Sequence, residues 1–302
     1  MIKLLKKLIF WSKIREQLIL SSHKRTASFC RMLISECQHS SDLYLITPKK
    51  DFGQKHIIWL YWAQGFSHSL IPPLVKMCID SIEKYCQGED CFIVKLSDDN
   101  IEDYITIPQP VKANLHKYSR AFFSDFLRCA LLSCYGGCWF DATVMLTDFI
   151  PAKYWEQELF LFQRSNSQPD KEYWEKAFAF YYGWNKRFKV RMLSSIMFCH
   201  KHNAVIEAAS AILNRFIAKG DKLPNYFFFQ ILFNELITGD FKNQNCEIVS
   251  DCIPHYLQQY INDPAFRNLH TPEEIIELTP IHKLTYKCDF DTDLLKQIIP
   301  DL

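Results

Sequence analysis

Apolar residues follow two kinds of pattern along the chain, short continuous runs and longer segments with helical spacing. Continuous apolar runs over residues 56–62, 91–96, 138–140 and 159–162 predict buried strands. Helical spacing predicts helices over residues 74–85, 120–135, 203–218 and 226–236. The paired Gly136 and Gly137 predict the end of the helix over 120–135.

The order of these elements predicts the fold class. A strand over 56–62, a helix over 74–85 and a strand over 91–96 follow one another within about 40 residues. This succession is a βαβ unit, which places its two strands parallel in one sheet. We therefore expect an α/β fold in which helices flank the sheet.

The start of the chain predicts a separate helical part over residues 1–41. Ile2, Leu5 and Ile9 share one helical face, and the first 31 residues hold eight Lys and Arg against one acid, Glu16. Two interpretations remain open: the helix lies on an anionic membrane surface, or it packs on the protein with its basic face in solvent. A polar linker over 47–53 places the expected boundary between an extension at 1–50 and a domain at 51–302.

Charge and cysteine content narrow the class of protein. The net charge of +1 gives no overall attraction to nucleic acid, so no nucleic-acid partner is expected. Twelve cysteines are scattered without a zinc-binding spacing, which indicates reduced thiols in a cytosolic protein. No apolar run reaches the roughly 18 residues needed to cross a bilayer.

One segment, residues 123–143, carries the candidate chemistry. Asp125 and Arg128 are three residues apart on the predicted helix and share a face. The strand after the Gly-Gly pair ends at Asp141, followed closely by Thr143, and ligands bind α/β sheets outside such carboxyl ends. Two carboxylates, a guanidinium and a hydroxyl are thus expected at one crevice.

These groups suit a substrate with a diphosphate leaving group. A carboxylate can hold Mg²⁺ or Mn²⁺ against the departing diphosphate, while a carboxylate and an arginine orient the sugar. The structural alternative is that Asp125 and Arg128 form an ordinary surface pair and Asp141 makes a turn. Asp98 and Asp99, which follow the strand over 91–96, have the same two interpretations, ribose contact or turn formation.

The segment also resembles a known family. Ser-Asp-x-x-Arg at 124–128 and Tyr-Gly-Gly-x-x-x-Asp-x-Thr at 135–143 resemble the donor-site signature of glycosyltransferase family 32, most of all its capsular polysaccharide synthesis relatives. Trp-Ala-Gln-Gly at 62–65 and Pro-Ile-His-Lys-Leu-Thr-Tyr-Lys at 280–287 extend the resemblance. It covers roughly residues 57–287 and is strongest over 124–143.

The resemblance implies a GT-A fold, a Rossmann-like single mixed sheet flanked by helices, for residues 51–302. It implies transfer from a nucleotide sugar, such as a UDP- or GDP-sugar, with retention at the anomeric carbon. In this family pattern, Asp125 and Arg128 would contact the donor sugar, and Asp141 would bind the metal and the diphosphate. Tyr61 and Trp62 would lie near the base. His282 and Lys283 would contact the diphosphate.

The sequence departs from the family pattern at one position. Family 32 enzymes carry Asp-x-Asp, whereas Thr143 stands here in place of the second acid. A hydroxyl is a weaker, neutral ligand for Mn²⁺ or Mg²⁺, although hydroxyl ligands to Mg²⁺ occur in P-loop sites. A metal site at Asp141 and Thr143 is the expectation.

These inferences predict a cytoplasmic glycosyltransferase for capsule or surface polysaccharide. Under the first interpretation of the N-terminal helix, residues 1–40 also make it peripheral at the inner membrane. Its partners would be a nucleotide sugar and a glycan or lipid-linked glycan acceptor. Two alternatives remain: a non-catalytic subunit of a capsule assembly complex that binds a nucleotide sugar or glycan, suggested by Thr143, and a hydrolase of nucleotide sugars.

Overall fold

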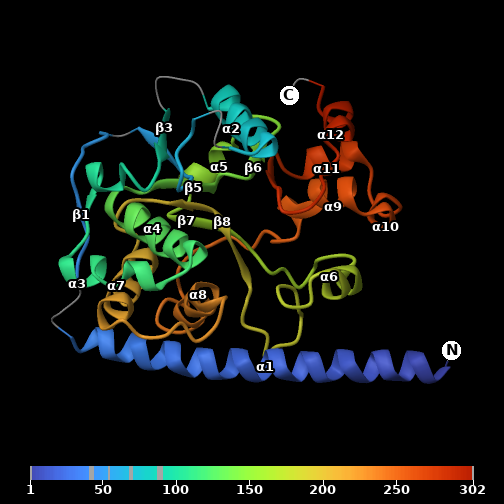
Figure 1. Cartoon of the computed structure of the whole chain (residues 1–302), viewed down its shortest axis with the longest axis horizontal. Helices are drawn as coiled ribbons and strands as arrows, with labels where there is room; N and C mark the ends of the chain where they lie inside the picture. The colour runs from blue at the N-terminus through green and yellow to red at the C-terminus, as the bar shows by residue number, and fades with distance from the viewer. Residues whose placement is uncertain (1, 41–43, 54, 68–70, 87–90, 301–302) are drawn as a thin grey trace.

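The structure is a computed structural model that describes residues 2–40, 44–53, 55–67, 71–86 and 91–300, with side chains from residue 12 onward. A five-stranded mixed sheet in the order β3-β2-β5-β8-β7 forms its centre (Figure 1). The strands are β2 (His56–Tyr61), β3 (Cys91–Leu96), β5 (Gly137–Asp141), β7 (Leu159–Gln163) and β8 (Met192–Cys199). The expected α/β fold with a mixed sheet between helices is confirmed.

Strands β2, β3 and β5 are parallel, and β8 and β7 run antiparallel to their neighbours. The parallel pairing of β2 with β3 is the arrangement that the strand-helix-strand pattern predicts. Two short ladders accompany the sheet, β1 (Thr47–Pro48) with β4 (Ile105–Thr106) and β6 (Val144–Leu146) with β9 (Ile281–Lys283). Residues 47 and 48 therefore form a strand, where the sequence analysis predicts a linker.

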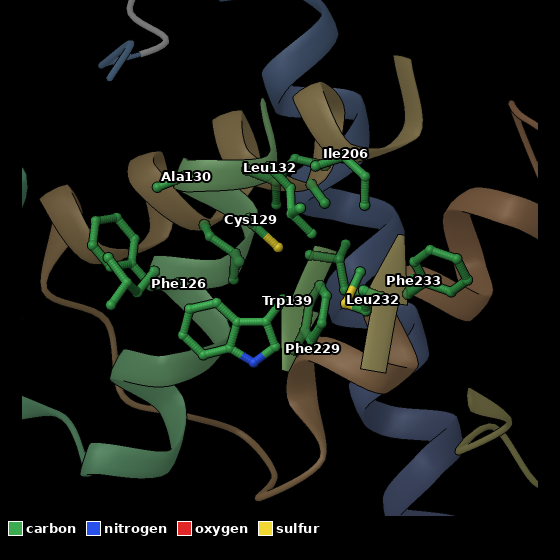
Figure 2. Close-up of a cluster of buried hydrophobic side chains, with 14 of the residues drawn as sticks. Phe126, Cys129, Ala130, Leu132, Trp139, Ile206, Phe229, Leu232 and Phe233 are labelled. Atoms are coloured by element: carbon green, nitrogen blue, oxygen red, sulfur yellow. The ribbon is translucent and has the colours of Figure 1, made fainter. Parts of the chain in front are cut away.

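Helices cover both faces of the sheet. One face packs against α1 (Ile2–Gln38), α4 (Arg120–Tyr135), α7 (Ala204–Lys219) and α8 (Phe228–Thr238). Figure 2 shows this core, where Phe126 and Leu132 of α4 and Trp139 of β5 gather with Phe229 and Leu232 of α8. The other face packs against α2 (Pro73–Tyr85), α5 (Ala152–Glu156) and the β6–β9 ladder.

The remaining helices connect strands of the sheet or come after its last strand in the sequence. They are α3 (Gln109–Lys112), α6 (Lys171–Ala177), α9 (Tyr256–Asn262), α10 (Pro264–Arg267), α11 (Pro272–Leu278) and α12 (Thr292–Ile298), with 3-10 turns that include η3 (Ile253–His255). Helices α9 to α12 form the C-terminal group, drawn in orange and red in Figure 1. This group supplies one wall of the cavity described below.

The turn between α4 and β5 fixes the position of the candidate site. Ser119 caps the helix by accepting a hydrogen bond from the amide of Phe122. Gly136 and Gly137 both have positive φ, at 70° and 95°, and a Cβ on Gly137 would lie 2.4 Å from the carbonyl oxygen of Ile57. Only glycine allows the chain to turn this tightly and bring β5 in beside β2.

Helix α1 is longer than any other element and runs along one side of the molecule (Figure 1). From Ile19 onward it buries one face against α7 and α8, whereas Lys13, Arg15 and Leu18 are exposed. The side chains of residues 2–11, which the amphipathic prediction uses, lie outside the described part. Among the helices that the structure describes, none carries an apolar stretch fit to cross a bilayer.

Candidate active site

A cavity of about 1100 Å³ opens at the carboxyl ends of β2 and β5. These strands end side by side, with Tyr61 paired in register with Asp141. The predicted site residues that line the cavity are Tyr61, Trp62, Asp125, Arg128, Asp141, Thr143 and Lys283. Segments far apart in the sequence thus meet at the position where α/β folds bind ligands.

Arg128 lies at the centre of an ion cluster in this cavity. Its Nη1 donates a hydrogen bond to Asp125 Oδ1 at 2.6 Å, and its Nη2 donates to Asp141 Oδ1 at 3.1 Å. The guanidinium lies 5.3 Å from the ring centre of Trp139, whose indole N–H donates to the same Asp141 oxygen at 2.9 Å. One buried cation therefore holds both predicted carboxylates in place.

The two carboxylates have opposite electrostatic environments. Burial raises the pKa of Asp125 to about 7, despite the opposing effect of Arg128, and the charge of Asp141 adds to the rise. Burial also acts to raise the pKa of Asp141, but Arg128, Lys283 and two side-chain hydrogen bonds outweigh it, so this pKa lies below its usual value. Asp141 is thus the anion of the pair at neutral pH, whereas Asp125 titrates close to neutrality.

We expect the Asp125→Asn variant to lose part of the pH dependence of unfolding between about pH 4 and pH 7. The pKa of Asp125 rises from an ordinary 3.8 to about 7 on folding, so in this interval the folded state binds more protons than the unfolded state. Stability from this group is present at low pH and is lost as the pH rises, by on the order of 3 kcal/mol. Urea unfolding at pH 4 and at pH 7 measures the unfolding free energy of both proteins. If this free energy changes by the same amount between the two pH values in wild type and variant, the prediction is wrong.

Strand β9 brings a second cation, Lys283, into the cavity. Its Nζ donates hydrogen bonds to the hydroxyl of Thr143 and, at 3.1 Å, to the carbonyl of Leu284. The same Nζ lies 3.9 Å from Asp141 Oδ2. Burial lowers the pKa of Lys283, and the charge of Asp141 partly opposes this. The ammonium group therefore lies against both residues of the predicted Asp-x-Thr metal site.

His282 lies outside the cavity, which corrects its predicted contact with the diphosphate. Successive side chains of a strand point to opposite faces, so His282 points away from the side that Lys283 occupies. It is fully buried, and its Nε2 lies 3.1 Å from Thr147 Oγ1. Burial lowers the pKa of His282 to about 3, so the imidazole is neutral.

At another edge of the cavity, Tyr61 joins an ion pair that the sequence analysis missed. The hydroxyl of Tyr61 donates to Asp98 Oδ1 at 2.6 Å. Arg120 contacts both oxygens of Asp98, at 2.8 and 2.6 Å, and its side chain is 68% exposed. Trp62 lies beside them, and its buried indole N–H has no hydrogen-bond partner among the described residues. The sequence signal that could have indicated Arg120 is its position, four residues before the Ser-Asp-x-x-Arg motif.

Neutral polar groups line the part of the cavity between β8 and the C-terminal group. Gln230 donates to Ser194 Oγ at 3.0 Å, while its Oε1 is buried and unpartnered within the described structure. The Nε2 of His255 is buried in the same way, and burial lowers the pKa of His255 to about 3, with a smaller effect from Lys283. Buried polar atoms without partners match the hydroxyl groups of a sugar. The sequence analysis missed both residues, since neither belongs to a motif.

The ligand set at Asp141 and Thr143 does not fit a divalent cation as the side chains are arranged. Asp141 Oδ1 already accepts from Arg128 and Trp139, and the Thr143 hydroxyl accepts from Lys283. Across the described residues, no group of three or more His, Cys, Asp and Glu side chains is placed to hold a metal ion. A hard cation prefers several free oxygen ligands, which this arrangement leaves scarce.

Comparisons with known proteins concern the chain as a whole. Residues 11–299 match the family described as "Capsular polysaccharide synthesis protein", a wider range than the motifs span and one that includes most of α1. No curated protein matches the chain. Among solved structures it is similar to "PaToxG Glycosyltransferase", at 12% identity over 76% of this chain and 81% of that chain, with a TM-score of 0.37. The family match covers nearly the whole sequence, and the chain belongs to the capsular polysaccharide synthesis protein family.

Proposed function

We propose that the protein is a glycosyltransferase that moves a sugar from a UDP- or GDP-sugar to a capsular or surface polysaccharide acceptor. One observation carries this proposal: Arg128 joins Asp125 and Asp141 at the carboxyl end of a parallel strand, inside a cavity of about 1100 Å³. A cavity of this size admits a nucleotide sugar. Its charged end suits a diphosphate, and its neutral polar wall suits sugar hydroxyls.

The reaction breaks the bond between the anomeric carbon and a diphosphate oxygen and forms a bond to an acceptor oxygen. Negative charge develops on the departing diphosphate, where Lys283 and Arg128 supply positive charge. Asp125 and Arg128 orient the donor sugar through its hydroxyl groups. We propose retention: the acceptor attacks from the side that the diphosphate leaves, and its proton passes to a diphosphate oxygen, so no protein base is needed.

The nucleoside is proposed to lie at the edge formed by Tyr61, Trp62 and Arg120. The aromatic rings offer faces for a base, and the Asp98–Arg120 pair offers polar contacts to a ribose or phosphate. We propose that the acceptor enters beside other aromatic residues that line the cavity, which include the exposed Tyr226.

The Arg120→Ala variant is expected to weaken donor binding by about 10-fold and leave kcat nearly unchanged. The exposed side chain of Arg120 pairs with Asp98 and not with the carboxylates of the ion cluster, so we expect it to contribute to binding equally before and during reaction. Initial rates across donor concentrations measure KM and kcat separately. A fall in kcat with unchanged KM would contradict this placement of the nucleoside.

A panel of UDP- and GDP-sugars, with and without a capsular oligosaccharide acceptor, tests the function. Transfer predicts release of nucleoside diphosphate and a lengthened oligosaccharide. A hydrolase would give free sugar in both conditions, whereas a non-catalytic subunit would raise its melting temperature with one donor and release nothing. Absence of turnover and of any thermal shift across the panel would refute a nucleotide-sugar site.

We also propose that residues 1–40 bring the protein to an anionic membrane surface, where a lipid-linked acceptor resides. Exposed Lys13, Arg15 and Leu18 offer charge and apolar area on the part of α1 that precedes its buried face. Flotation with vesicles that contain phosphatidylglycerol is expected to carry the full chain upward. Recovery of all the protein in the bottom fraction would contradict membrane binding.

A further inference from the structure

The side chain of Lys283 occupies the position between the two residues of the Asp-x-Thr motif. The ammonium donates to the Thr143 hydroxyl and lies 3.9 Å from Asp141 Oδ2. The side chain is only 17% exposed, so Lys283 is held within the cavity wall. Its backbone is fixed as well, because β9 pairs with β6 and the amide of Leu284 donates to the Thr143 carbonyl at 2.9 Å. The ammonium is therefore a built part of the site.

Two of the three side-chain oxygens that Asp141 and Thr143 offer a divalent cation are already in hydrogen bonds, and the third faces this ammonium. Asp141 Oδ1 accepts from Arg128 and from Trp139. The Thr143 hydroxyl accepts from Lys283, and Asp141 Oδ2 faces the same ammonium. An ion bound at these atoms would displace the lysine or lie directly against its positive charge.

The charges near the site already favour a diphosphate. Arg128, Lys283 and Lys287 are cations that line the cavity, and of the acids Asp141, Asp125 and Asp263 that line it, Asp125 is partly protonated. Lysine has three N–H donors, and Lys283 uses two of them in hydrogen bonds to Thr143 and Leu284. One donor remains for an oxygen of the ligand, so the group can both hold the motif and contact a phosphate.

We infer that the Lys283 ammonium takes the place of the divalent cation, so that the protein binds nucleoside diphosphates and transfers sugar without a metal ion. This inference rests on the proposed function. Thr143 is then explained, because a second acid beside Asp141 would be required only to bind a metal. A neutral hydroxyl accepts a hydrogen bond from Lys283 and leaves the positive charge of the site available to the diphosphate.

Calorimetric titration of UDP and GDP into the full chain tests the inference, in excess EDTA and again in Mn²⁺. Wild-type protein is expected to bind one of them in EDTA, with an affinity that Mn²⁺ changes less than about twofold. Lys283→Met should weaken this binding and slow donor turnover by about 100-fold, the effect of removing one preorganised donor. Lys283→Arg should recover part of the loss, and Lys296→Met, which removes an exposed lysine on α12, should match wild type.

A double variant distinguishes positive charge supplied by Lys283 from positive charge supplied by a metal ion. Lys283→Met with Thr143→Asp recreates an acidic pair without the lysine, and its nucleotide affinity is expected to depend on Mn²⁺. If EDTA abolishes wild-type binding and Mn²⁺ restores it, the inference is overturned while the proposed function stands. If wild type binds neither nucleotide in either condition, both fall. The wild-type titration alone decides these outcomes, even if a variant fails to fold.

Discussion

The Asp141→Asn variant is expected to lose sugar transfer by roughly 1000-fold while it keeps its fold. Asparagine preserves the shape of Asp141 and can still accept the hydrogen bonds that Arg128 and Trp139 donate to Oδ1. It removes the negative charge that attracts both Arg128 and Lys283. Without this charge, the two cations are no longer held in the positions from which they contact the diphosphate. Nucleoside diphosphate release at saturating donor measures the loss, and circular dichroism with a melting temperature verifies the fold.

A matched control is available at the neighbouring strand. Asp99 follows the carboxyl end of β3 much as Asp141 ends β5, but it is exposed and does not line the cavity. Asp99→Asn should therefore transfer sugar within about twofold of wild type. An Asp141→Asn enzyme that stays within about twofold of wild-type activity, as the control does, would show that this carboxylate has no part in catalysis.

Local sequence signals account for the elements that carry the central motif. The helix predicted over residues 120–135 is α4 to the residue, because Ser119 caps it, apolar side chains recur at helical spacing and Gly136 ends it. Asp141 ends β5 as predicted, since the apolar run stops there. Convergence of Asp125, Arg128 and Asp141 followed from these two elements and one tight turn between them.

Contacts between distant segments explain what the sequence could not predict. Lys283 reaches Thr143 only through the pairing of β9 with β6, and a shift of one residue in that register would have brought His282 to the cavity instead. The order of these two residues in the motif gives no sign of which one faces inward. Arg120 meets Asp98 through an equally distant contact, and the antiparallel direction of β8 depends on the segment between β7 and β8, which carries no motif.

A buried ion pair beside the cavity is another contact between residues that are far apart in the sequence. Arg164 and Asp251 have fully buried side chains and meet through two hydrogen bonds, at 2.9 and 2.8 Å. Arg164 also donates to the carbonyls of Gly183 at 3.1 Å and Tyr181 at 3.0 Å. Because Tyr181 and the neighbouring Tyr182 line the cavity, this pair holds one of its walls in place.

The Arg164→Met variant is expected to lose about 3–5 kcal/mol of unfolding free energy, because Asp251 would remain as a buried, unpaired charge. Urea unfolding measures the loss. The double variant Arg164→Met/Asp251→Leu should recover much of it, since it removes both charges and fills the space with apolar groups. As a control, Lys76→Met removes an exposed pair with Asp80 and should change stability by less than about 1 kcal/mol. Equal losses in Arg164→Met and Lys76→Met would mean that water enters the interior at Asp251 and compensates its charge.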